Sequence, residues 1–487
     1  MTARITLLAT IGTRDLAFQL GNGEWMNIGN DRMNQDGFTE MAEVITDLDL
    51  SETEYLRSYR KLTKYLLDNI DTYCERVMPV ILGKLIRDYS QDIERTYFIV
   101  TDQQGVRERQ KDTLYSGQIL KAWVEKNYPD IEVNLIFLGR SGEDPTDFDR
   151  MFRWWRSQWR DAIQVSAPAP IWVCLKGGVG QTSEAGRVSS LSFYGNRVQF
   201  FEFQQDEEAN KQGQPSPYTS PSSGANYLWD RTQQQVLQQL KRYDYVGAEE
   251  LLEPYFATNS STFGALPTLL KAGAAWQRGQ FETFFGRAKN CFPTRDRMRD
   301  RQWWWMAYEQ AYLARIRLEQ GYASEAMLHG FRAVEGMLWE WAPCQFPHDV
   351  KTQPGGYSRL RKSICAQFPS LERSLFHSEA EVELRGRAMQ TLLEAAIPAT
   401  THSSDFKSYW RTATHARNQL SHRLGGIDAR DVFKAWGQDI VSAQQWEKRI
   451  LACLNEVTGQ KFAGFEDGSL FHVVQIKALE LTASYQL

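Results

Sequence analysis

The chain has 487 residues, 42% of them hydrophobic and 24% charged, so its composition is that of a globular protein of two or three domains and not of a disordered or fibrous chain. A formal net charge of −4 excludes a strong overall attraction to nucleic acid, and any RNA binding is expected to be local. Six scattered cysteines without zinc-binding spacing, no signal-peptide pattern and no apolar run of roughly 18 residues predict a cytoplasmic protein without disulfides or a membrane span.

The N-terminal segment begins with a short apolar run and a glycine turn. Ile5–Thr10 is predicted to be a buried strand, and Ile11–Asp15 the turn that follows it. Leu16–Leu20 and Glu24–Ile28 flank a glycine-rich turn and are predicted to form a hairpin. Thr53–Tyr89 has apolar residues at helical spacing, which predicts one long helix or two.

Strand and helix patterns then alternate as far as residue 205. The predicted strands are short and apolar, and this alternation is typical of a doubly wound parallel sheet. We therefore expect residues 1–205 to form a Rossmann-like α/β domain. The strands are Thr96–Thr101, Ile131–Leu138, Ile171–Leu175 and Val198–Phe203, and the helices are Asp112–Asn127, Thr146–Ile163 and a segment ending at Tyr194.

Residues 206–226 are rich in Pro, Ser and acidic residues and are predicted to be a linker or an exposed loop. Helical patterns dominate afterwards, which predicts a helical connecting region over 227–300 and an all-α domain over 301–487. Trp303-Trp304-Trp305 is interpreted as core or as an interface between copies. The predicted helices are Gln233–Tyr255, Pro267–Phe285, Arg299–Glu319, Ala323–Trp341, Tyr357–Phe368, Ala380–Ala396, Asp405–Ser421 and Ala429–Thr458, followed by a short strand and helix in Leu470–Leu487.

Three loops are expected at the carboxyl ends of the parallel strands, where open α/β sheets bind their ligands. Glycines let the backbone approach a ligand closely, and the free N–H groups at a helix start favour phosphate. The candidate ligand-binding residues are Gly12, Thr13 and Arg14 in the first loop, Thr101, Asp102 and Thr113 in the second, and Lys176, Gly177, Gly178, Val179, Gly180, Gln181 and Thr182 in the third.

The third loop, Lys176–Thr182, resembles the deviant phosphate loop of ParA/MinD-type ATPases. Gln181, however, stands where those ATPases have the lysine that reaches the β- and γ-phosphates. The loop also follows a late strand, whereas those ATPases carry it after their first. We therefore interpret it as a phosphate-shaped loop and keep an ATPase as a remote alternative.

The segment Ala416–Arg423 places Arg417, Asn418 and His422 within two turns of a predicted helix. Arginine grips phosphate with a fork of N–H donors, and histidine moves protons near neutral pH. Together they predict a site that cleaves RNA through its own 2′-hydroxyl without a metal. Because Arg417 and His422 lie some 140° apart on an ideal helix, either the helix ends between them or two copies of the segment meet across a two-fold axis.

The order of these parts resembles the CARF–HEPN ribonucleases of type III CRISPR systems, the Csm/Csx group. A doubly wound domain with a late glycine–threonine loop precedes a helical region. That region contains a helix beginning at Ala326 with the pattern AxxxxFRAVEGxLW and, later, the Arg417–His422 spacing. In that family, an arginine separated from a histidine by four to six residues marks the catalytic site.

The resemblance implies an endoribonuclease with Arg417, Asn418 and His422 as catalytic residues and no metal or catalytic cofactor. It implies that the residues selected in the three loops bind a cyclic oligoadenylate, a tetra- or hexa-adenylate, as an allosteric activator. It also implies a homodimer that acts on single-stranded RNA, without a membrane and without stable association with the CRISPR effector complex. The open alternative is a non-catalytic nucleotide sensor whose helical domain binds a partner.

Separately, Arg332 and Glu335, three residues apart on one helix, are predicted to be able to pair with each other.

Overall fold

The computed structural model describes residues 4–29, 35–166, 168–258, 263–353, 356–377, 379–420 and 424–486. It divides into two compact units, with the boundary between Asp230 and Arg231. No helix among the described residues is both long and apolar enough to cross a membrane.

A six-stranded sheet forms the centre of the first unit. Its order is β6-β5-β1-β7-β8-β9, and all neighbouring strands are parallel except β8 and β9. The predicted doubly wound parallel sheet is therefore confirmed, with the first strand of the chain at its centre. The strands are β1 Ile5–Thr10, β5 Ile93–Thr101, β6 Glu132–Leu138, β7 Ile171–Cys174, β8 Val198–Phe200 and β9 Ser222–Ser223.

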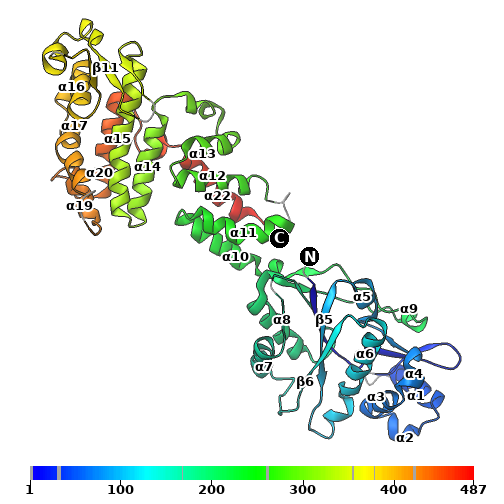
Figure 1. The fold of residues 1–487 in the computed structure, drawn as a ribbon. Helices are drawn as coiled ribbons and strands as arrows, with labels where there is room; N and C mark the ends of the chain where they lie inside the picture. Colours follow the sequence, from blue (N-terminus) through cyan, green and yellow to red (C-terminus); the bar gives the residue numbers. More distant parts are fainter. Residues whose placement is uncertain are drawn as a thin grey trace. The chain divides into compact units, whose positions relative to one another are not determined.

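Helices cover both faces of this sheet because successive side chains of a strand point to opposite faces. Leu7 packs in one core together with Leu62, whereas Leu8 packs in the other core together with Trp155. The first face is covered by α3 and α6 and the second by α7 and α8 (Figure 1). Their bounds are α3 Tyr59–Asp68, α6 Leu114–Asn127, α7 Phe148–Asp161 and α8 Gly180–Tyr194.

A small antiparallel sheet follows β1, and it contains the predicted hairpin. β2 Leu16–Gln19 pairs with β3 Trp25–Asn27 on one side and with β4 Val77–Pro79 on the other. The strand β4 makes the prediction of one or two helices over Thr53–Tyr89 wrong. Pro79 cannot continue a helix, and Val77 and Met78 find strand partners in β2 instead. The remaining helices of this region are α1 Gln35–Asp47, α2 Glu52–Tyr55, α4 Ile70–Tyr73 and α5 Gly83–Asp88.

Residues 206–226, which were predicted to be a linker or an exposed loop, are mostly exposed or half-buried. They contain α9 Glu207–Lys211 and the edge strand β9. The Ser216 backbone N–H donates to the Val80 carbonyl, and the Tyr218 hydroxyl donates to Asp88 over 2.8 Å. These hydrogen bonds hold the segment against the rest of the first unit, and the Tyr218 ring also packs against Phe201 with ring centroids 5.8 Å apart.

The second unit is mostly helical, as predicted, but it is not all-α, because it also contains the small antiparallel sheet of β10, β11 and β12. α14 and α15 run side by side (Figure 1), and α20 packs against both. The C-terminal helix returns to α12, where the Phe471 ring stacks on Trp276 with ring centroids 3.7 Å apart. From residue 224 onward the helices are α10 Gly224–Lys241, α11 Tyr245–Thr258, α12 Leu266–Gln277, α13 Phe281–Ala288, α14 Trp305–Glu319, α15 Ala323–Gln345, α16 Gly386–Ala396, α17 Ser404–Ser408, α18 Thr414–Leu420, α19 Ala429–Trp436, α20 Ala443–Thr458, α21 Phe465–Gly468 and α22 Phe471–Ser484.

Several predicted helix boundaries are wrong. The helix predicted over Gln233–Tyr255 breaks at Tyr243, whose φ of 61° lies in the left-handed region. The helix predicted over Tyr357–Phe368 is replaced by a strand. That strand, β11 Arg359–Arg361, lies between β10 Val350–Lys351 and β12 Glu381–Glu383 in an antiparallel sheet. Pro369 and the glycines before Tyr357 bound the segment too closely for a stable isolated helix. A short strand was also predicted in Leu470–Leu487, but the described part of that segment is occupied by α22.

Candidate functional site

A cavity of about 670 Å³ opens at the carboxyl ends of β1, β5 and β7. Its walls come from the loops that follow these three strands and from the loop after β6. This is the edge of a doubly wound sheet where ligands are expected. The lining residues that the sequence predicted are Gly12, Thr13, Thr101, Thr113, Gly178, Val179 and Thr182.

The first and third loops touch through their glycines. A Cβ atom added to Gly177 would overlap the backbone of Thr10, Ile11 and Gly12. Gly178 has a φ of 95°, which favours glycine. The Gly12 backbone N–H also donates to the Asp15 carboxylate. These contacts explain why the two loops form one continuous wall although they lie far apart in the sequence.

The second loop is held closed by a network of hydrogen bonds and ion pairs. Thr101 and Thr113 bond reciprocally, each backbone N–H donating to the other hydroxyl over 3.0 and 2.9 Å. The Arg60 guanidinium lies 2.8 Å from the fully buried Asp112 carboxylate and 3.0 Å from Asp102. The Asp112 carboxylate also accepts the Gln103 backbone N–H over 2.8 Å. The loop is therefore shaped before any ligand binds.

Six predicted activator-binding residues do not line this cavity: Arg14, Asp102, Lys176, Gly177, Gly180 and Gln181. Asp102 is instead engaged by Arg60 and by Arg140, whose Nε lies 2.9 Å away. Lys176 is exposed. The sequence analysis did not select the polar lining residues Gln103, Glu108, Lys111, Asp144 and Thr146. The first three lie in the loop between β5 and α6, and their place after a parallel strand could have indicated them.

The N-terminus of α8 borders the cavity, with Val179 in extended conformation before its first turn. No side chain caps this end, so its backbone N–H groups are the donors available there. The Thr182 hydroxyl donates to the Pro145 carbonyl over 2.9 Å and thereby ties α8 to the loop after β6. The start of α8 thus provides backbone N–H donors to the cavity, whereas the Thr182 hydroxyl is used to hold α8 against the loop after β6.

In the second unit, α18 carries the predicted catalytic arginine against α15. The Arg417 guanidinium lies over the Phe331 ring, 4.2 Å from its centroid. One guanidinium nitrogen is 3.5 Å from a Glu335 carboxylate oxygen. Glu335 was predicted to be able to pair with Arg332, but its ion pair is with Arg417. Burial raises the pKa of Glu335, and the positive charges of Arg417 and Arg332 oppose that rise.

The predicted catalytic triad is only partly visible. Asn418 is exposed on α18. His422 lies outside the described residues, between Leu420 and Leu424. The structure thus brings Arg417 together with Phe331 and Glu335, two residues that the sequence analysis did not select as catalytic.

A π-helical turn precedes α18 and determines which side of α18 faces α15. This turn, η10 Tyr409–Ala413, follows α17 directly. Tyr409 is buried and stacks on Phe331 with ring centroids 5.3 Å apart. One extra residue per turn rotates the following helix, and such turns are frequent at functional sites. A small hollow beside the turn is lined by Phe331, Glu335, Leu338, Trp339, Gly386, Met389, Tyr409, Trp410 and Thr414.

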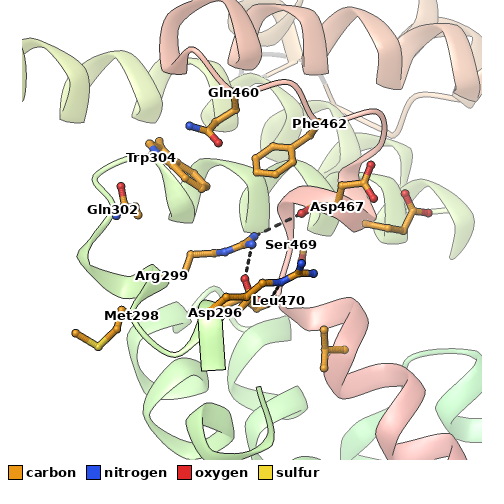
Figure 2. A pocket seen from close by; sticks show the side chains of 13 residues that line it. Asp296, Met298, Arg299, Gln302, Trp304, Gln460, Phe462, Asp467, Ser469 and Leu470 are labelled. Carbon is orange, nitrogen blue, oxygen red and sulfur yellow. Dashed lines mark hydrogen bonds and ion pairs between the residues drawn. The ribbon is translucent and has the colours of Figure 1, made fainter. Parts of the chain in front are cut away.

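A separate cavity of about 760 Å³ in the second unit contains none of the predicted site residues. Figure 2 shows Arg299 at its centre, with Trp304 and Phe462 on one side. The Arg299 guanidinium donates to Asp296 over 2.6 Å and to the Gly468 carbonyl over 2.9 Å. Arg299 therefore acts as a cross-link between two loops. Trp304 and Trp305 are buried, which confirms that they belong to the core.

Among the described residues, no three His, Cys, Asp or Glu side chains gather in a way that could hold a metal ion.

A comparison with solved structures identifies the fold. Enterococcus italicus Csm6 bound to cyclic hexa-2′-fluoro-hexa-dAMP matches 98% of this chain and 100% of its own, with a TM-score of 0.60 and 12% sequence identity. This chain has the CARF–HEPN fold. The resemblance predicted from the order of the motifs is confirmed at that level. No family model and no curated protein matches the sequence.

Proposed function

We propose that this protein is an endoribonuclease of type III CRISPR antiviral defence that cleaves single-stranded RNA when a cyclic oligoadenylate binds its first unit. The observation that carries the proposal is the fold shared with Csm6 over nearly the whole chain, in a structure where that protein holds a cyclic hexanucleotide analogue. Two local features support it: a preformed cavity with several polar side chains at the sheet edge, and an arginine beside an aromatic ring and a carboxylate in the helical unit.

The proposed reaction needs no metal or catalytic cofactor. The 2′-oxygen of a ribose attacks the adjacent phosphorus while the bond from phosphorus to the 5′-oxygen breaks. His422 takes the 2′-hydroxyl proton or supplies a proton to the departing 5′-oxygen. Arg417 stabilises the negative charge of the phosphorane, and Asn418 orients the phosphate through hydrogen bonds. The products are a 2′,3′-cyclic phosphate and a 5′-hydroxyl.

The proposed active unit is a cytoplasmic homodimer. One copy supplies one Arg417 and one His422, and a two-fold axis would bring the second pair into the same cleft. A ring with two-fold symmetry that binds one dimer arrangement better would shift the population towards the cleaving state.

The cavity at the sheet edge suits such a ring in its chemistry. Backbone N–H groups at the start of α8 and the Lys111 ammonium can bind phosphate. Glu108, Asp144 and Gln103 offer acceptors for the amino groups of adenine.

Cleavage of labelled single-stranded RNA in the presence of EDTA, with and without cyclic tetra- or hexa-adenylate, tests the proposal. Cleavage that appears only with a ring supports an activated nuclease. Tight binding of a ring without cleavage by any preparation would support the alternative, a non-catalytic sensor that acts through its helical unit. ATP hydrolysis without RNA cleavage would support the remote ATPase alternative, which Gln181 disfavours.

A further inference from the structure

Two aromatic residues and an arginine form a continuous exposed surface on the second unit. Trp339 of α15 and Tyr357 each expose 40% of their surface. Their rings meet edge to face with centroids 5.3 Å apart. The Arg385 guanidinium lies over Tyr357, 5.2 Å from the ring centroid, and its side chain is 63% exposed. We name Trp339, Tyr357 and Arg385 the aromatic strip.

The aromatic strip is connected to the candidate catalytic arginine. Trp339 and Glu335 line the same hollow, together with Gly386, the neighbour of Arg385. Glu335 is the residue that pairs with Arg417. The strip therefore borders a hollow whose wall includes the ion-pair partner of Arg417.

The charge around the strip favours a polyanion. Residues 359–361 and 381–387, which form β11, β12 and the start of α16, contain four arginines against two glutamates. The excess of two positive charges in these two segments lies on the side of Tyr357 and Arg385, whereas Trp339 has Glu335 and Glu340 on its own helix. Local positive charge of this kind attracts a phosphate backbone without a global basic field.

We propose that the aromatic strip stacks the unpaired bases of single-stranded RNA next to the bond that is cleaved. The inference rests on the proposed function, because it takes RNA as the substrate. Every base presents a π-face to an aromatic ring, whatever its identity, and arginine adds a cation–π contact. The strip therefore favours single strands over duplexes and selects only weakly for sequence.

Fluorescence anisotropy with a labelled single-stranded 2′-O-methyl RNA tests this inference on the full-length protein. The 2′-O-methyl group removes the nucleophile, so binding is measured whether or not the protein cleaves RNA. Trp339→Ala is expected to weaken binding about tenfold, the loss typical of one stacked base, and Trp339→Phe about twofold or less. Tyr322→Ala is the matched control, since Tyr322 is also exposed beside an arginine but lies outside the strip and the hollow.

Unchanged affinity in Trp339→Ala would overturn the inference, provided that thermal unfolding shows a folded protein. If that variant does not fold, Tyr357→Ala is expected to give a comparable loss and decides the question in the same way. Loss of affinity accompanied by dissociation of a dimer would also overturn it, because the strip would then be an interface between copies.

The outcome is separable from that of the proposed function. Binding that depends on Trp339, without cleavage of natural RNA, removes the nuclease and keeps the RNA-binding surface. Cleavage with binding independent of Trp339 keeps the nuclease and removes the surface.

Discussion

The Arg417 guanidinium and the Glu335 carboxylate lie 3.5 Å apart, on helices that pack against each other. Both side chains are partly exposed, at 30% and 37%, so the pair contributes at most about 1 kcal/mol to stability. Its larger effect is on geometry. Phe331 fixes the plane of the guanidinium from one side, and Glu335 restricts its rotation. We infer that Glu335 is a positioning residue for Arg417.

Glu335→Gln is expected to lower kcat for RNA cleavage about fivefold with little change in KM, since a weak orienting ion pair is lost while the shape is retained. Glu340→Gln is the matched control because Glu340 is exposed on the same helix. Steady-state kinetics of the two variants at pH 7.5 measure the difference. A higher kcat in Glu335→Gln would instead mean that Glu335 restrains Arg417.

His422→Ala is expected to abolish RNA cleavage while leaving activator binding intact. The imidazole is the proposed proton carrier, whereas the activator is proposed to bind the first unit. Gel assays of cleavage and calorimetry of ring binding on the same preparation measure the two properties. Full cleavage by the variant would remove His422 from the mechanism.

The sequence and the structure point to different lysines of the first unit as ligands of the activator. Lys176 was selected because it leads the glycine loop, but Lys111 lines the cavity and Lys176 does not. Lys111→Ala is therefore expected to weaken binding of a cyclic oligoadenylate about tenfold, the effect of one charge-assisted hydrogen bond. Lys176→Ala is expected to have a smaller effect. Calorimetric titration of both variants decides, and the reverse order would place the ligand outside this cavity.

The contact between the first and third loops predicts a steric effect. Gly177→Ala is expected to destabilise the first unit by about 1–3 kcal/mol, because the new Cβ would overlap backbone atoms that cannot move independently. Gly180→Ala is the control, since a Cβ there meets no atom within 4 Å. Thermal unfolding compares the two. Equal midpoints would show that the loops separate easily.

The sequence predicted those parts of the fold that depend on local pattern. The parallel sheet followed from short apolar strands such as Ile5–Thr10, because a strand buried on both faces has no polar alternation. The strand Val77–Pro79 was missed because its apolar residues continue the helical spacing of the residues before it. It is a strand because it pairs with β2. Such pairing is a tertiary contact that a local pattern does not contain.

The candidate site was predictable in its loops and not in its side chains. The three loops selected for their glycines and strand ends each contribute residues to the cavity. Lys111 reaches it only because Arg60 and Asp112 fold the second loop back, which requires a partner from a distant helix. Glu335 likewise meets Arg417 only through the packing of α15 on α18. Contacts between residues far apart in the sequence therefore determine which lysine or glutamate reaches the site.

His329 provides a prediction about pH and stability. Burial lowers its pKa to about 4, and the positive charges of Arg332 and Arg317 add to this effect. Its Nδ1 is hydrogen-bonded to the Gln310 amide from α14. In the unfolded chain the same ring has a pKa of about 6.5. Below that value the unfolded state binds a proton that the folded state does not.

Stability from His329 is therefore fully present above about pH 6.5 and is lost as the pH falls towards 4. We expect a decrease of about 2 kcal/mol in the unfolding free energy of the second unit, since the half-buried ring is partly screened by water. Urea unfolding at pH 7 and pH 4.5, followed by tryptophan fluorescence, measures it in the wild type and in His329→Gln. The variant keeps a hydrogen-bonding side chain but cannot titrate, so its stability should fall less between the two pH values. An equal decrease in both proteins would show that His329 is protonated in the folded state as readily as in water.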